Sequence, residues 1–183
     1  MAPDDVVSFW REAGPDRWFK KDEAFDARIR ERFARLYEAA ARGELDGWAD
    51  TPEGLLALVL VLDQFSRNLF RDDARAFRHD DRALALAHAA HERGWVERLL
   101  EREDTAPVAV FAIMPLMHSE GIADQELCVR LMLRPRWADN FGFAVVHRDV
   151  IRRFGRFPHR NPVLGRHTTP AERAFLDGGG FGG

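Results

Sequence analysis

The feature that most constrains this chain is an uninterrupted apolar run, LLALVLVL, at residues 55 to 62. Thr51, Pro52 and Glu53 precede it in the order of a helix start, with proline at the first helical position and an acid in the first turn. A helix that is apolar on all sides for two turns has no face to give to solvent. We therefore predict a central, buried helix over residues 52 to 70 that contacts at least two others.

A carboxylate ends this run. Asp63 follows the eight apolar residues directly, and Arg67 lies four residues further on the same helix face. An isolated buried carboxylate is costly, so Asp63 needs a cation, hydrogen bonds or a water-lined cavity. Either Asp63 and Arg67 pair simply to complete the helix, or the polar residues of this stretch line a pocket. Those residues are Asp63, Gln64, Arg67 and Asn68.

Helical periodicity fills most of the remaining sequence. The spacing of apolar residues and the positions of caps and glycines predict further helices over residues 22–42, 81–93, 106–117, 122–134, 137–154 and 169–176. Asp22 is the expected cap of the first of these, and the T-P-A-E capping box at Thr169 opens the last. Pro115 should kink or end the apolar helix that contains it. No strand-length run alternates clearly with hairpin turns, so the sequence predicts an all-α fold of about seven to nine helices in antiparallel hairpins.

Length and composition are those of one globular domain, which we expect to cover residues 1–183 with a flexible glycine-rich tail at 178–183 unless Phe181 finds a pocket. Cys128 is the only cysteine, so no intramolecular disulfide can form and a reducing compartment is expected. The first residues lack the basic region of a signal peptide, and the longest apolar run is too short to span a bilayer. We expect a cytoplasmic protein without a membrane partner.

The positive charge of this chain is concentrated in one segment. The net charge is −3, yet residues 150–171 hold five arginines and no acid, and RRFGRFPHRN at 152–161 interleaves them with phenylalanine. Arginine forks bind carboxylates and phosphates in bidentate geometry, and phenylalanine supplies apolar walls. This predicts a site for an anionic small molecule. The alternative is an ordered loop whose arginines pair with acids of the protein itself, such as Asp63, Glu120 and Asp124.

A histidine and a carboxylate end another apolar segment, in PLMHSE at residues 115–120. His118 is the candidate general acid–base, oriented by Glu120, if the pocket is catalytic. The alternative is a helix end at which His118 caps carbonyl groups while Ser119 and Glu120 begin the next helix.

Other classes of site have little support. The sequence has no HExxH motif, no cysteine cluster and no glycine-rich loop that opens a helix, so we predict no metal site and name no cofactor. Arginine and aromatic residues together also suit stacked nucleic acid, but net acidity and the short basic segment argue against it. A helical scaffold that binds a peptide or protein along a groove remains an alternative.

Three long motifs together resemble a bacterial family of conserved proteins known only as domain of unknown function number 924. They are LLALVLVLDQFSRNLFRDDARAF, PLMHSEGIADQ and HRDVIRRFGRFPHRNPVLGRHTTPAE, and the resemblance extends from Phe9 and Trp10 to Phe175 and Leu176. Ser66 stands where the family's DQFPRN pattern would have proline, and HSEGIADQ is slightly altered. The resemblance implies an all-α, tetratricopeptide-like fold of helical hairpins and no established reaction.

The residues that match the family's motifs are mainly polar and come from four segments. They are Asp63, Gln64, Arg67, Asn68, Arg71, His118, Ser119, Glu120, Asp124, Gln125, His147, Arg153, Gly155, Arg156, Pro158, His159, Arg160, Asn161, Gly165 and Arg166. From these we take His118 and Glu120 as catalytic candidates. The candidate ligand-binding residues are Asp63, Gln64, Arg67, Asn68, Asp124, Gln125, His147, Arg153, Arg156, His159, Arg160 and Asn161. We expect a helical bundle to bring them around one pocket, with Phe154 or Phe157 packing beneath.

Overall fold

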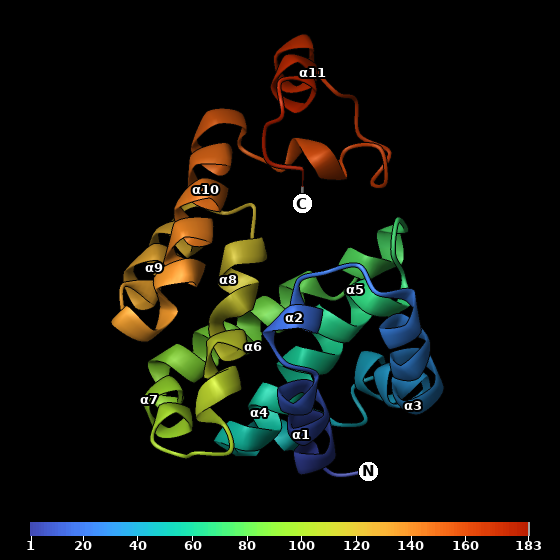
Figure 1. Cartoon of the computed structure of the whole chain (residues 1–183), viewed down its shortest axis with the longest axis vertical. Helices are drawn as coiled ribbons and strands as arrows, with labels where there is room; N and C mark the ends of the chain where they lie inside the picture. The colour runs from blue at the N-terminus through green and yellow to red at the C-terminus, as the bar shows by residue number, and fades with distance from the viewer. Residues whose placement is uncertain (183) are drawn as a thin grey trace. The chain divides into compact units, whose positions relative to one another are not determined.

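The computed structural model describes residues 1–182 and confirms an all-α protein, because no β-strand occurs in that range (Figure 1). The chain divides into two compact units, an N-terminal unit of Met1–Pro115 and a C-terminal unit of Leu116–Gly183. Helix α8, Met114–His118, crosses the junction between them. Short helical segments are more numerous than the seven to nine helices that the sequence predicts, because turns of differing helical type break up the longer apolar stretches.

The N-terminal unit surrounds one continuous helical rod. The rod consists of α4 (Pro52–Val59), η2 (Leu60–Phe65) and α5 (Ser66–Leu69), and every residue from Gly54 to Ser66 is buried. The flanking elements are α1 (Pro3–Ala13), α2 (Pro15–Trp18), α3 (Glu23–Ala41), η1 (Asp46–Asp50), η3 (Ala74–Phe77), α6 (Asp80–Glu92), α7 (Trp95–Leu100) and η4 (Ala106–Ile113). The rod contacts α1, α3, α6 and α7, which confirms the predicted central helix.

The middle of the rod is a π-helical turn, where the sequence predicts a plain α-helix. Leu60–Phe65 adopts this wider winding. The carbonyl oxygen of Asp63 there accepts hydrogen bonds from Ser66 Oγ at 3.0 Å and from Arg67 Nη1 at 2.6 Å. Single π turns are frequent at functional sites. Apolar periodicity alone could not reveal it, because the composition of the run is the same for either winding.

Most helix ends follow the predicted capping chemistry. Asp22 accepts hydrogen bonds from the backbone N–H groups of Ala24 and Phe25 at the start of α3. Thr51 accepts one from Gly54 at the start of α4. Gly43 follows α3 with a φ of +84°, a left-handed conformation that glycine adopts without steric cost.

Several segments differ from the sequence-based expectation, and α2 and α7 lie outside every predicted range. Helix α1 was not predicted, although Pro3 at its first turn and Val6, Phe9 and Trp10 at helical spacing are the signal for it. The apolar segment before Pro115 is a 3₁₀-helix, η4, and not an α-helix. Pro115 does not end a helix. It lies near the start of α8, where a missing N–H costs no hydrogen bond.

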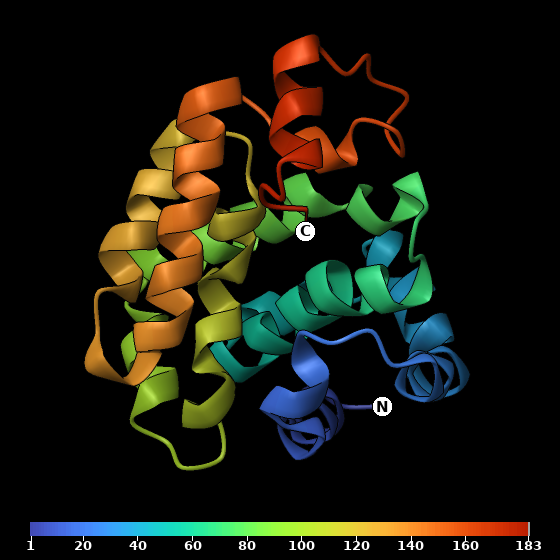
Figure 2. The ribbon, with the colours of Figure 1, turned by 45° about the horizontal axis from the view of Figure 1, so that its top comes forward.

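The C-terminal unit contains one helical hairpin and a compact final segment. Helices α9 (Ile122–Met132) and α10 (Ala138–Phe154) pack side by side, with η5 (Pro135–Trp137) in the link between them (Figure 2). Gly155 ends α10 in a left-handed conformation, with φ of +70°. The arginine-rich loop then leads through η6 (Pro158–Arg160) to α11 (Pro170–Asp177), which contacts η6.

The core of the final segment is aromatic. Val150, Ile151 and Phe157 are buried, and Phe154, Phe175 and Phe181 pack against them. Phe181 therefore does find a packing site, so the tail is held in place at that residue. The tail's last residue, 183, lies outside the described range. The grouping of all helices into tetratricopeptide-like hairpins and a single domain over 1–183 remain predictions.

Within residues 1–182, no helix combines the length and the apolar character that crossing a membrane requires.

The buried rod makes a direct prediction for stability. Leu58 and Leu62 are 1% and 0% exposed, so Leu58→Ala or Leu62→Ala should lower the free energy of unfolding by roughly 2–5 kcal/mol, the range for buried leucines. Leu133 is 71% exposed, and Leu133→Ala should change the free energy of unfolding by less than about 0.5 kcal/mol. Urea denaturation of the three variants checks this, and equal costs at Leu62 and Leu133 would contradict a central rod.

Candidate functional site

The polar residues of the rod form an internal network in the N-terminal unit. Asp63 is fully buried, and its Oδ1 lies 3.0 Å from Arg67 Nη1. Gln64 Nε2 donates to Asp63 Oδ2 at 2.6 Å. The buried carboxylate is therefore paired as the sequence predicts, and Gln64 lies against it.

Arg67 connects the rod to α6. Its Nη2 donates to Asp80 Oδ2 at 3.1 Å, and its guanidinium lies over the ring of Phe77. Burial alone would lower the pKa of Arg67, but Asp63 and Asp80 together raise it above its ordinary value. The guanidinium thus stays charged between two carboxylates.

A second polar group links the rod to α3 through Asp26, which sequence reasoning missed. Asn68 Nδ2 donates to Asp26 Oδ1 at 2.7 Å, and Arg71 Nη2 donates to the same oxygen at 2.8 Å. Burial would raise the pKa of Asp26, yet the hydrogen bonds from Arg71 and Asn68 outweigh it and hold the pKa below its ordinary range. Asn68 therefore completes an ion pair inside this unit.

In the C-terminal unit, Glu120 anchors the arginine-rich loop. Its Oε2 accepts from Arg166 Nη1 at 2.7 Å, and its Oε1 accepts from Arg166 Nη2 at 2.9 Å and from the backbone N–H of Phe157 at 2.8 Å. Arg166 Nε also donates to Asn161 Oδ1 at 3.0 Å. Burial would raise the pKa of Glu120, but these bonds lower it below its usual range. Both oxygens are directed to the loop, and the orientation of His118 by Glu120 remains a prediction.

Arg156 also pairs with a carboxylate. It forms a bidentate pair with Glu172, with Nε to Oε1 at 2.6 Å and Nη2 to Oε2 at 2.9 Å. The same Glu172 closes the capping box with Thr169 at the start of α11. Hydrogen bonds from Arg156 hold the pKa of Glu172 far below its usual range. The sequence indicated only the capping role of Glu172, because a carboxylate at that position is already accounted for.

The remaining arginines of the segment differ in setting. Arg152 pairs with Glu126, and Arg153 lies exposed over the rings of Phe154 and Phe175. Arg160 is buried, and its guanidinium lies 4.5 Å from the ring centroid of Phe157. Phe157 is therefore the ring that packs beneath a buried arginine.

Two histidines lie against the rings of Phe157 and Phe181, and a third lies beside one of them. His147 lies 5.6 Å from Phe157 and 4.3 Å from Phe181 between ring centroids, and His159 lies 5.6 Å and 5.3 Å from the same rings. His118 lies 6.5 Å from His147. Among the described residues, no group of three or more metal-binding side chains is placed to hold a metal ion. The histidines thus form an aromatic and basic cluster.

Burial keeps two of these histidines neutral at pH 7. It lowers the pKa of His147 to about 4, with His118 and Arg160 adding to the effect, and it lowers the pKa of His159 to about 4, aided by Arg160. His147 Nδ1 lies 2.8 Å from the carbonyl oxygen of Phe143. In a neutral ring this nitrogen donates, which leaves the Nε2 lone pair as an acceptor. His159 Nδ1 is buried without a hydrogen-bond partner in the described range.

The residues after His118 brace the start of α9. Gln125 is fully buried, and its Nε2 donates to the carbonyl oxygens of Met117 and Ser119, each at 2.7 Å. Ser119 Oγ donates to Asp124 Oδ2 at 2.6 Å. Gln125 and Asp124 therefore fix the turn that carries His118. Cys128, three residues after Gln125, is buried. Burial raises the pKa of its thiol to about 12, which is consistent with a packing role.

The structure thus places the predicted residues in separate groups. Asp63, Gln64, Arg67 and Asn68 join the rod network. His147, His159 and Arg160 surround Phe157, and His118 lies beside His147. Arg156 and Asn161 take part in pairing within the loop, whereas Arg153 lies over Phe154. The rod belongs to one unit and the loop to the other, and their meeting in one pocket remains a prediction.

The fold and these residues define an all-α protein with polar networks at helix ends and an ordered arginine-rich loop. The chain belongs to the family described as bacterial protein of unknown function (DUF924), whose model matches residues 6–180. It is similar to the solved structure of a protein of unknown function, ATU0120, from Agrobacterium tumefaciens. The two are 45% identical with a TM-score of 0.88, over 96% of this chain and 97% of that one. No curated protein matches. The family resemblance drawn from the motifs is confirmed.

The buried pair in the rod can be tested by removing its carboxylate. Asp63→Ala should lower the free energy of unfolding toward the low end of the roughly 3–5 kcal/mol expected when a buried pair is broken, because Arg67 keeps Asp80. The matched control is Asp16→Ala, which removes an exposed pair with Lys20 and should cost less than about 0.5 kcal/mol. Chemical denaturation measures both. Equal small losses would mean that Asp63 is not buried with its partner.

The neutral histidines predict a pH dependence of stability. Their folded-state pKa values of about 4 lie below the value near 6.5 of the unfolded chain, so the unfolded state binds more protons between these limits. The contribution of these two histidines to the free energy of unfolding should therefore be complete above about pH 6.5 and should decrease as the pH drops toward about 4. Urea titrations across this window check the slope. The variant His147→Gln/His159→Gln should show a flatter profile, and an unchanged slope would contradict this assignment.

Proposed function

We propose that this protein binds a small anionic molecule at the cluster of His147, His159 and Arg160 around Phe157, and that the histidines supply acid–base chemistry to it. The observation that supports the proposal is the placement of two neutral histidines beside a buried guanidinium on one aromatic floor. A buried cation next to neutral bases suits a ligand that carries a carboxylate or phosphate group.

Within this proposal the arginines have two tasks. Arg156 and Arg166 hold the loop through Glu172 and Glu120 and act as positioning residues. Arg160 supplies the planar fork that recognises a carboxylate or phosphate, with the ring of Phe157 beneath it. This division explains why so many arginines lie in one loop.

His147 is the best-oriented base of the cluster. Its bond to the carbonyl oxygen of Phe143 fixes the ring, so Nε2 can take a proton from a bound substrate. An anion beside the ring favours the protonated form and raises the pKa toward the working range of a general base. His118, at 6.5 Å from His147 between ring centroids, is the second acid–base candidate.

Thermal unfolding in the presence of small anions tests the binding. Phosphate, sulfate and acetate, compared at constant ionic strength, should include one that raises the melting temperature. A ligand at one hundred times its Kd stabilises by about 2.7 kcal/mol. The gain should vanish in Arg160→Lys, which keeps the charge but removes the fork. It should persist in Arg152→Ala, which removes an arginine of the same segment that pairs with Glu126.

The variants also separate binding from general salt effects. Sulfate and phosphate stabilise many proteins because they are excluded from the surface, and that effect would be equal in all three proteins. Equal stabilisation in wild type and Arg160→Lys would overturn the proposal. The arginine-rich segment would then be structural, and the helical scaffold for a peptide or protein partner would become the leading function.

A further inference from the structure

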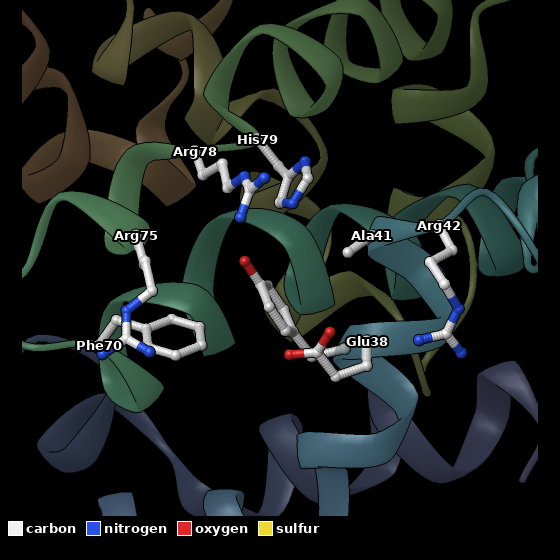
Figure 3. Close-up of a pocket in the computed structure, with 8 residues that line it drawn as sticks. Glu38, Ala41, Arg42, Phe70, Arg75, Arg78 and His79 are labelled. Carbon is white, nitrogen blue, oxygen red and sulfur yellow. The ribbon is translucent and has the colours of Figure 1, made fainter.

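A cavity of about 350 Å³ opens in the N-terminal unit at the C-terminal end of α3 (Figure 3). Tyr37, Glu38 and Arg42 come from the end of α3, and the opposing wall comes from the segment between α5 and α6. Figure 3 shows Arg78 and His79 projecting together from that segment. The volume lies at the lower end of the range for small-molecule sites. No residue of this cavity was singled out in the sequence.

The arginines of the cavity differ in how they are paired. Arg42 donates to Glu44 at 2.6 Å, and Arg75 forms a bidentate pair with Asp73. The guanidinium of Arg78 forms no hydrogen bond or ion pair with any residue in the range 1–182. Its guanidinium is therefore available to a ligand, whereas the charges of Arg42 and Arg75 are already matched by carboxylates.

Two polar side chains beside Arg78 also keep unused hydrogen-bonding groups. Tyr37 is only 4% exposed, yet its hydroxyl group makes no hydrogen bond within the described chain. The ring of His79, 5.9 Å from that of Tyr37, makes none either. Burial and then Glu38 raise the pKa of Tyr37, and burial and then Arg78 lower the pKa of His79. At pH 7 both groups are neutral and can donate a hydrogen bond.

The cavity also has an aromatic wall. The rings of Tyr37 and Phe70 lie 5.3 Å apart, and the guanidinium of Arg75 lies 4.6 Å from the centroid of Phe70. A flat apolar group can pack on such rings while its charged end reaches the arginine. Glu38 is exposed and is the counter-charge on the rim.

We propose that this cavity is a second binding site, for a small organic anion with a flat apolar body, such as an aromatic carboxylate. The fork of Arg78 takes the carboxylate, the Tyr37 hydroxyl group and the His79 ring donate to it, and the body packs on Phe70. The site is independent of the histidine cluster around Phe157.

The single tyrosine gives a direct readout. Because Tyr37 is the only tyrosine of the chain, protein labelled with ring-¹³C tyrosine reports on this cavity alone in NMR spectra. Benzoate should shift the Tyr37 ring signals in a saturable way. Acetate has the charge without the ring, and benzyl alcohol has the ring without the charge, so each should bind about tenfold more weakly or worse, the loss that accompanies one charged or apolar contact.

Matched variants decide the role of Arg78. In Arg78→Gln the benzoate affinity should fall about tenfold or more, as expected when a charged hydrogen bond is lost. Arg35→Gln removes an exposed arginine of α3 without a partner in the described chain, and should leave the affinity unchanged. Equal benzoate affinity in Arg78→Gln and wild type would overturn the proposal, as would equal shifts from benzoate and benzyl alcohol. Arg160 does not line this cavity, so a negative result for anion binding at the histidine cluster would not contradict benzoate binding here, and the reverse also holds.

Discussion

The burial of a carboxylate inside an apolar rod is the constraint on which the N-terminal unit depends. Asp63 could not remain charged there alone, because an isolated buried charge costs several kcal/mol. Arg67 satisfies it, and Arg67 in turn contacts Asp80 at the start of α6. One and four residues after Arg67, Asn68 and Arg71 contact Asp26 of α3. Ion pairs and hydrogen bonds at the polar end of the rod therefore connect it to two neighbouring helices, α6 and α3, in addition to the apolar packing.

The arginine-rich loop has an excess of positive charge that must be paired with carboxylates from elsewhere in the chain. It has five positive charges and no acid of its own, so its carboxylates come from the residues before and after it. Glu120 engages Arg166 and the backbone of Phe157, and Glu172 engages Arg156. These bidentate bonds order a segment with little regular structure. The order has a further consequence, because it presents Phe157 as a fixed floor for the histidines.

The sequence predicted what depends on local spacing and failed where geometry depends on distant partners. The caps at Asp22, Thr51 and Thr169 were predicted correctly, because each cap bonds to a backbone group three residues away or less. The winding of Leu60–Phe65 and Ala106–Ile113 was not, since α, 3₁₀ and π turns share one apolar composition. The loop's partner Glu172 was missed because one carboxylate serves both a cap and an ion pair.

The candidate site was predictable to a similar degree. The charge that ends an apolar run singled out Asp63, and the concentration of arginines singled out the loop; both belong to polar networks. The cavity at Tyr37 was not found, because that residue belongs to the apolar stripe of α3 and only its hydroxyl tip is polar. Periodicity assigns such a residue to the core. Only the tertiary structure shows that this residue lines a cavity.

The two proposed sites share one physical device, a guanidinium that helps to hold a histidine neutral. Burial and then Arg78 lower the pKa of His79, and Arg160 adds to the burial that lowers the pKa of His147. An anion bound to either arginine cancels part of its field, so the histidine beside it gains basicity. Anion binding and proton uptake are then linked, and by reciprocity each strengthens the other. Under these proposals, a site built in this way would bind its anion more tightly as the pH falls toward the pKa of its histidine.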